Sequence, residues 1–289
     1  HPVDRLLNII EGASWDKSGQ ELVYEVTVPE TGNYKLALHY QNRKEDFAVF
    51  RTLRIDGEIP FQEVMAYPFP VTKGNQWQLE VLSAPNGEPF EFYLTEGTHK
   101  ISICADYEPV AKSVRDIHLI LNHINQFSLE IIKLTGKNVD KNRTWQLTRY
   151  IPETDQYLEA YEILIKNIIS ELAVYAPNQE ASAALSFLQK SIYILEKLRE
   201  FPDRLPIYLE DLFTGSGSVA QRLGDSIDML SRQPLSLGSL VVYNQEEVAP
   251  PKAALAVRVS SGFQSFLSSF RSDKYSPKLD LDVVDVWVN

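Results

Sequence analysis

The chain has 289 residues, 44% of them apolar and 11% aromatic, which is enough to build the packed cores of about two domains. Its 28 basic and 39 acidic residues give a net charge of -11, which repels phosphates and anionic lipid headgroups. Nucleic acids and membrane surfaces are therefore poor candidate partners. Cys104 is the single cysteine, which excludes an intrachain disulfide and a metal site built from thiolates. No run of about 18 apolar residues occurs, so we expect no direct insertion into a membrane.

Residues 1–108 alternate between apolar and polar positions, and this period of two predicts β-strands with one buried face. In 33–40, for example, Tyr34, Leu36, Leu38 and Tyr40 share one side of the strand. Asp56-Gly57 is the strongest short hairpin signal in the chain. We expect strands at 22–28, 33–40, 47–55, 58–64, 76–83, 90–94 and 99–105. Short strands at hairpin spacing, rich in aromatic residues, indicate an antiparallel β-sandwich of jelly-roll type.

After residue 108 a period of 3.6 replaces the period of two, which predicts helices. A long amphipathic helix is expected over 109–134, with Pro109 near its start and Gly136 just past its end, where their backbone preferences belong. Ser218 and Gln221 form a capping-box pattern at the start of another helix. Further helices are expected at 154–176, 178–200 and 218–231, each followed closely by a proline. The short connections predict antiparallel packing into a bundle.

The pattern changes again in the last fifty residues. A strand is predicted at 239–243, a helix at 263–270 and a strand at 279–289, which reads LDLDVVDVWVN. The pattern leaves open whether the strand at 239–243 pairs within this segment or with another sheet. The fold class is thus α+β, with a β-sandwich over 1–108, an antiparallel helical bundle over 109–235 and a short β-α-β segment over 236–289.

Catalytic chemistry has little support in the sequence. Glycoside cleavage needs two carboxylates about 5 to 10 Å apart. The sandwich offers Glu58, Glu63, Glu88 and Glu91, but nothing singles out a pair. The stretch 215–220 matches a loose dinucleotide fingerprint without the preceding strand that this motif needs, and a helix boundary explains its glycines better. We predict no catalytic residue, no cofactor and no metal site.

Aromatic and planar polar side chains on a β-sandwich suit a different chemistry. Sugars present C–H faces that stack on aromatic rings, and hydroxyls that hydrogen-bond with planar polar groups. The candidate carbohydrate-binding residues are Tyr40, Asn42, Arg51, Arg54, Tyr67 and Trp77. Because Arg51 and Arg54 are three positions apart on one strand, at most one of them can face the ligand. The alternative is that these aromatic residues lie in the core or against the helices.

Several motifs carry a resemblance to a known family. In the sandwich they are YKLALHY at 34–40, RTLRIDGEIPF at 51–61, AYPFP at 66–70 and FYLTEGTHK at 92–100. Nearer the C-terminus they lie at 234–243, 250–252, 265–275 and 284–289. Together these stretches resemble the N-terminal region of long extracellular solute-binding proteins from bacterial carbohydrate ABC importers.

The resemblance implies a galactose-binding-like carbohydrate module and a helical region that lead into a solute-binding module. The strand at 279–289 would then be the first strand of that module, and the module itself would lie beyond Asn289. We expect a non-enzymatic, extracellular region of a sugar-transport lipoprotein at the cell surface, with a lipid anchor upstream of His1. Its partners would be an oligosaccharide and, through the full-length protein, an ABC permease.

Two functions stay open within this interpretation, and a third lies outside it. The sandwich binds saccharide itself, or the sandwich and helices form a spacer or protein-interaction platform without a ligand. The third function, outside this interpretation, is that of a glycoside hydrolase accessory domain. An exposed groove lined by aromatic and planar polar groups would favour saccharide binding, whereas burial of Tyr40, Tyr67 and Trp77 with no groove nearby would count against it.

Overall fold

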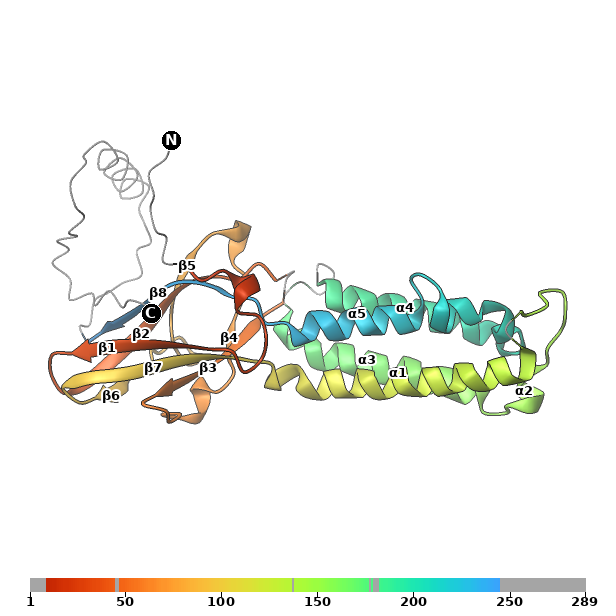
Figure 1. Ribbon diagram of the computed structural model, residues 1–289, viewed down its shortest axis with the longest axis horizontal. Coiled ribbons are helices and arrows are strands. Elements are labelled where there is room, and N and C mark those ends of the chain that lie inside the picture. The colour runs from red at the N-terminus through yellow and green to blue at the C-terminus, as the bar shows by residue number, and fades with distance from the viewer. Residues whose placement is uncertain (1–8, 45–46, 137, 177, 179–181, 245–289) are drawn as a thin grey trace, which may run out of the picture.

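The computed structural model describes residues 9–44, 47–136, 138–176, 178 and 182–244. A β-sandwich occupies one end of the molecule, and a long bundle of helices extends from it (Figure 1). The predicted antiparallel sheets and the helical region after them are confirmed. The expected helix at 263–270, the expected strand at 279–289 and the motifs at 250–252, 265–275 and 284–289 lie outside the described residues. No described helix is both long enough and apolar enough to cross a membrane.

The sandwich is built from two antiparallel sheets. One sheet has the order β1-β7-β3-β4, and in the other β2 pairs with β5, β6 and β8. The strands are β1 (Glu21–Val28), β2 (Gly32–Gln41), β3 (Val49–Ile55), β4 (Tyr67–Phe69), β5 (Gln78–Val81), β6 (Phe92–Leu94), β7 (Gly97–Asp106) and β8 (Ser236–Tyr243). Residues from both sheets, among them Leu36, Leu38, Phe92 and Ile103, form one apolar core. The period of two therefore identified the buried face of β2 correctly.

One expected strand is wrong. Residues 58–64 form no continuous strand, because Gln62–Val64 is a short 3-10 turn and the strand that returns along β3 is β4. Pro60 has no backbone N–H to donate, which disfavours a strand across this position. The tight turn at Asp56-Gly57 is confirmed, since the φ angles of the two residues are 53° and 89°.

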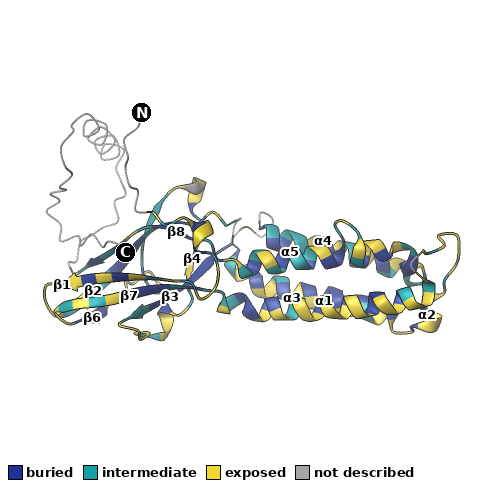
Figure 2. Cartoon of the chain, in the orientation of Figure 1, coloured by how far each residue is buried: buried dark blue, intermediate teal, exposed yellow. Residues whose placement is uncertain are grey.

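The bundle consists of four long helices whose buried sides face one another (Figure 2). They are α1 (Glu108–Thr135), α3 (Thr154–Leu172), α4 (Ala183–Glu200) and α5 (Val219–Ser231), and the short α2 (Leu147–Tyr150) lies near the far end. The Ser218 hydroxyl oxygen accepts a hydrogen bond from the Gln221 backbone N at 3.2 Å, so the predicted N-cap of α5 is confirmed. A Cβ at Gly215 would lie 2.6 Å from a backbone oxygen, which explains this glycine by packing alone.

The bundle is inserted between two strands of the sandwich. β7 ends at Asp106 just before α1 begins at Glu108, and α5 ends at Ser231 shortly before β8 begins at Ser236. β8 then runs antiparallel to β2, with Leu240 opposite Leu38. The sequence left the partner of this strand open and grouped it with a C-terminal segment. Since its apolar side chains enter the sandwich core, residues 236–243 belong to the sandwich instead.

The two parts share a continuous apolar junction. Phe47, Ala48 and Phe50 lie around the start of β3, yet they pack in the hydrophobic core of the bundle. The backbone N of Ala48 donates to the carbonyl oxygen of Tyr175 at 2.9 Å. The rings of Phe50 and Tyr175 meet edge to face with their centroids 4.9 Å apart. The sandwich and the bundle are therefore packed as one body, with two chain connections and a shared core between them.

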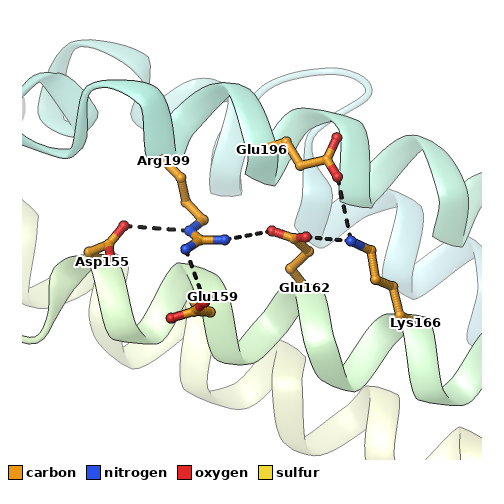
Figure 3. A network of polar contacts seen from close by, with 6 residues as sticks. All are labelled: Asp155, Glu159, Glu162, Lys166, Glu196 and Arg199. Carbon is orange, nitrogen blue, oxygen red and sulfur yellow. Dashed lines mark hydrogen bonds and ion pairs between the residues drawn. The ribbon is translucent and has the colours of Figure 1, made fainter.

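An ion-pair network links α3 to α4 (Figure 3). Arg199 on α4 contacts Asp155, Glu159 and Glu162 on α3, and the shortest of these contacts joins Arg199 Nη1 to Glu162 Oε2 at 2.9 Å. Glu162 also pairs with Lys166 at 2.5 Å, and its side chain is only 11% exposed. Hydrogen bonds from Lys166 and Arg199 hold the pKa of the Glu162 carboxyl below its usual range. This network favours one register of α3 against α4.

Candidate functional site

Three of the six predicted carbohydrate-binding residues, Tyr40, Asn42 and Tyr67, are buried in the sandwich. Their exposed fractions are 0%, 0% and 8%. The Tyr40 hydroxyl donates to the carbonyl oxygen of Pro70 at 3.2 Å, and the Tyr67 hydroxyl donates to Glu80 Oε1 at 3.4 Å. The amide of Asn42 donates to two backbone carbonyl oxygens at 2.9 and 3.2 Å. Burial raises the pKa of both phenols, so they stay neutral and serve internal hydrogen bonds.

Arg51 is also buried and ties three chain segments together. Its guanidinium donates to the carbonyl oxygens of Phe50, Trp15 and Gln233 at 2.8, 3.2 and 2.6 Å. The guanidinium carbon lies 4.0 Å from the centroid of the Trp15 ring, a cation–π contact. Burial lowers the pKa of Arg51 to about 9, which leaves the side chain protonated at neutral pH. Carbonyl dipoles and an aromatic face thus stabilise this charge inside the protein, out of reach of a ligand.

Arg54 and Trp77 lie nearer the surface but belong to different sheets. Arg54 on β3 pairs with Glu21 at 3.7 Å, and Trp77 precedes β5 and packs on His39 with ring centroids 5.0 Å apart. Burial lowers the pKa of His39, which favours the neutral ring in this stack. The structure therefore does not bring the six residues to one surface. The alternation along β2 already placed Tyr40 on the core side, and this signal outweighs the presence of an aromatic ring.

A different set of residues surrounds an open groove of about 520 Å³ on the sandwich. The groove lies where β2, the 3-10 turn before β4 and the loop between β5 and β6 meet. This loop folds back on itself, since Ser83 pairs with Pro89 and the backbone N of Phe90 donates to Leu82 O at 2.9 Å. The groove is lined by Lys35, Phe61, Glu63, Ala84, Glu88, Pro89, Phe90 and Glu91.

Phe61 and Phe90 form the aromatic wall of this groove. Their ring centroids are 5.1 Å apart with an interplanar angle of 63°. Phe61 also stacks on the buried ring of Phe92, at 5.2 Å and 28°. Both wall residues are half-buried, and their contacts with the sandwich core hold the rings in place. A rigid aromatic edge of this kind can pack against the C–H face of a ligand.

Three carboxylates, Glu63, Glu88 and Glu91, stand around the same groove and are exposed to solvent. Glu91 is oriented by Asn33, whose Nδ2 donates to its Oε2 at 3.0 Å. Lys35 on β2 adds an ammonium donor. Exposed carboxylates and an ammonium suit hydrogen bonding with hydroxyl groups, whereas a general acid is typically held in an apolar enclosure that keeps it protonated. The groove is therefore suited to binding a polar ligand.

In the sequence, these three carboxylates were candidates only for membership of a catalytic pair, and no pattern connected them with Phe61 and Phe90. The turn-rich stretch 85–90, which reads PNGEPF, was the sequence feature that could have indicated this groove. Binding residues lie disproportionately on loops that a rigid scaffold positions. The pairing of distant segments around the groove was not visible in the sequence.

Two further hollows lie on or beside the helices. One, of about 360 Å³, opens between α1 and α3 and is mostly apolar; it contains His123, whose Nδ1 is 2.5 Å from the Tyr161 hydroxyl. The other, of about 250 Å³, lies at the junction beside Lys44 and Arg232. Within the described residues, no group of three or more His, Cys, Asp or Glu side chains could hold a metal ion.

Comparison with known proteins identifies the helical part of the chain. Residues 112–230 match the family model described as the bacterial solute-binding protein, 4-helix bundle domain. This range begins in the first turns of α1 and ends in the last turn of α5. The inserted bundle is thus a four-helix bundle domain of bacterial solute-binding proteins, which confirms the resemblance seen in the motifs. This match supports an accessory region of a solute-binding protein. No curated protein matches it.

Solved structures resemble about a third of the chain. A family 35 carbohydrate binding module from an environmental isolate is 17% identical with a TM-score of 0.26, and the match covers 32% of this chain and 58% of that one. A family 35 carbohydrate binding module from Clostridium thermocellum is 16% identical with a TM-score of 0.24, covering 34% and 86%. A cycloisomaltooligosaccharide glucanotransferase from Paenibacillus sp. is 20% identical with a TM-score of 0.25, covering 36% and 16%. TM-scores of this size say nothing about what the present chain binds.

Proposed function

We propose that this chain is a non-catalytic accessory region of a solute-binding protein that serves a bacterial carbohydrate importer, and that its sandwich binds a saccharide. The groove beside Phe61 and Phe90 is the binding site in this proposal. The family of the helical bundle supports the role in a solute-binding protein. The combination of an aromatic wall, carboxylates and an ammonium around one open groove is the observation that supports saccharide binding.

The groove can meet both chemical faces of a sugar ring. The edges of Phe61 and Phe90 offer apolar contact, while Glu63 and Glu88 accept hydrogen bonds from hydroxyls and Lys35 donates one. A groove of about 520 Å³ falls within the size range of small-molecule sites. Its open shape suits a short segment of an oligosaccharide better than a fully enclosed monosaccharide.

The same function implies a cellular location and a membrane partner for the full-length protein. A solute-binding protein works outside the cytoplasmic membrane, extracellular or periplasmic, and we infer a lipid anchor and an ABC permease as its membrane partners. The sandwich would hold a polymer near the importer, where its local concentration matters more than tight affinity.

The test compares two matched double variants. A panel of soluble glucan, mannan, xylan and galactan oligosaccharides is titrated calorimetrically against the 289-residue chain. Glu63→Gln with Glu88→Gln removes two groove carboxylates, and Glu58→Gln with Glu96→Gln removes two exposed carboxylates outside the groove. We expect the groove pair to weaken binding about tenfold or more, because a hydrogen bond to a charged group contributes about 1.5 to 3 kcal/mol. No binding by a folded chain, or equal binding by both pairs, would contradict the saccharide site.

The platform without a ligand remains the second candidate. The shared core and the buried Arg51 join the sandwich to the bundle as one body, which suits a rigid spacer. Uniform silence across the saccharide panel, with the chain folded, would favour this function.

A further inference from the structure

The groove on the sandwich is lined by more negative than positive charge. Glu63, Glu88 and Glu91 line it together with one cation, Lys35, so three carboxylates and one ammonium give a sum of -2. In the part of the chain that the structure describes, none of these four side chains belongs to an ion pair. The groove therefore presents an unbalanced negative charge to a ligand.

Other cations of the sandwich do not offset this charge. Residues 56–96, which supply the turn and the loop at the groove, hold seven acidic side chains and one basic one, Lys73. The residue before Lys73 donates its backbone N–H to the carbonyl oxygen of Asn42 at 3.0 Å. Asn42 is seven positions beyond Lys35, roughly 23 Å along an extended chain. Lys100 lies in the other sheet, 3.8 Å from a carboxylate on β1.

The three carboxylates are held by different elements around the groove. Glu63 lies in the 3-10 turn before β4. Glu88 lies in the loop between β5 and β6, where its backbone N donates to Asn86 Oδ1 at 3.1 Å. Glu91 accepts a hydrogen bond from Asn33, which occupies one of the roughly four acceptor positions of a carboxylate. The groove thus surrounds a ligand with anchored acceptors that have capacity to spare.

The aromatic wall suits a positively charged ligand as well. The face of a phenyl ring attracts an ammonium group within about 6 Å of its centroid, and the rings of Phe61 and Phe90 are held in place by the core. Hydrogen bonds between an ammonium and a carboxylate are about twice as strong as bonds between neutral groups. A carboxylate on the ligand would instead meet three like charges. The charge of the groove therefore distinguishes between classes of sugar.

We propose that the groove selects saccharides that carry free amino groups, such as oligomers of glucosamine, and rejects saccharides that carry carboxylates, such as oligomers of galacturonic acid. This inference rests on the saccharide site proposed above and names the class of sugar that the site takes. The C–H face of a sugar ring packs on the aromatic wall, and the ammonium groups bond with the carboxylates. Lys35 donates to a hydroxyl or to the ring oxygen.

The test is calorimetric titration of the 289-residue chain at about pH 6 and about 0.1 M salt, where amines are protonated and carboxylates are ionised. Three tetrasaccharides are compared: the glucosamine tetramer of chitosan, cellotetraose and the galacturonic acid tetramer. Cellotetraose has a hydroxyl in place of each amine and is therefore the matched neutral ligand. We expect the glucosamine tetramer to bind at least about tenfold more tightly than cellotetraose, because its hydrogen bonds are charge-assisted. We expect no binding of the galacturonic acid tetramer.

Matched double variants separate the groove from the net charge of the chain. Glu63→Gln with Glu88→Gln should bring the two dissociation constants to within about threefold of each other, because most of the added attraction comes from these carboxylates. Glu58→Gln with Glu96→Gln gives the same total charge, removes exposed carboxylates outside the groove and should keep the tenfold preference. An equal loss of preference in both pairs would mean attraction by the net charge of -11, and it would overturn the inference.

The remaining outcomes distinguish this inference from the proposed function. If the folded chain binds cellotetraose and the glucosamine tetramer equally, or binds the galacturonic acid tetramer best, the preference for amines is wrong and the saccharide site stands. If the folded chain binds none of the three tetramers and none of the neutral oligosaccharides, both proposals are wrong.

Discussion

Gln233→Leu should destabilise the whole molecule, because this side chain bonds both parts of the fold. Gln233 is 0% exposed and lies between α5 and β8. Its Oε1 accepts from the backbone N of Phe50 at 3.0 Å, and its Nε2 donates to Leu230 O at 3.0 Å. Leucine has a similar volume but leaves one buried N–H and one buried carbonyl without these partners.

The expected loss is about 2 to 6 kcal/mol in the free energy of unfolding. Each buried polar group that loses its partner costs about 1 to 3 kcal/mol, and two groups are affected. Urea unfolding followed by far-ultraviolet circular dichroism measures this loss as a lower midpoint at an unchanged slope. Gln126→Leu on the exposed side of α1 is the control, and it should change stability by less than about 0.5 kcal/mol. If the two variants are equally stable, Gln233 does not join the sandwich to the bundle as described.

A double-mutant cycle extends this test. The backbone oxygen of Gln233 accepts from Arg51 at 2.6 Å, so the two residues belong to one hydrogen-bonded network. We expect Arg51→Met and Gln233→Leu to be non-additive by at least about 0.5 kcal/mol. Additive effects would mean that the arginine and the glutamine act independently.

Three further predictions follow from other parts of the fold. Gly215→Ala should destabilise the protein, because the added Cβ would lie 2.6 Å from a backbone oxygen. Gly224→Ala inside α5 should stabilise the protein by about 0.5 to 1 kcal/mol, because its added Cβ would have no atom within 4 Å. Thermal midpoints that shift in the same direction in both variants would contradict this. Arg199→Met should lower stability by about 1 to 2 kcal/mol at low salt and by less at 1 M salt, and a salt-independent loss would refute an electrostatic role. His99 donates to Asp56 at 2.6 Å, which raises the pKa of His99 and lowers that of Asp56. The stabilisation from this ion pair is complete between about pH 4 and 6.5 and is lost as pH rises through the folded pKa of His99. His99→Asn should therefore lower the free energy of unfolding, measured with urea, more near pH 5 than near pH 9.

The candidate site shows where inference from composition failed. Tyr40, Asn42, Arg51 and Tyr67 have the chemistry of a sugar site, yet all four are buried and serve internal contacts. Residue type alone cannot distinguish an aromatic ring that binds a ligand from one that fills a core, because burial of apolar area favours both. The groove at Phe61 and Phe90 depends on three segments that are distant in the chain.

Local pattern determined the elements of this protein, and long-range packing determined their partners. Apolar residues at periods of two and 3.6, together with caps, prolines and the Asp56-Gly57 turn, predicted the sandwich strands and the bundle helices, since these preferences act over a few residues. Only the tertiary structure showed that β8 returns to pair with β2, which makes the bundle an insertion in the sandwich. It also placed the charge of Arg51 inside. These features arise from contacts between residues far apart in the chain, where the free energy of burial and hydrogen bonding depends on the partner and no local pattern specifies it.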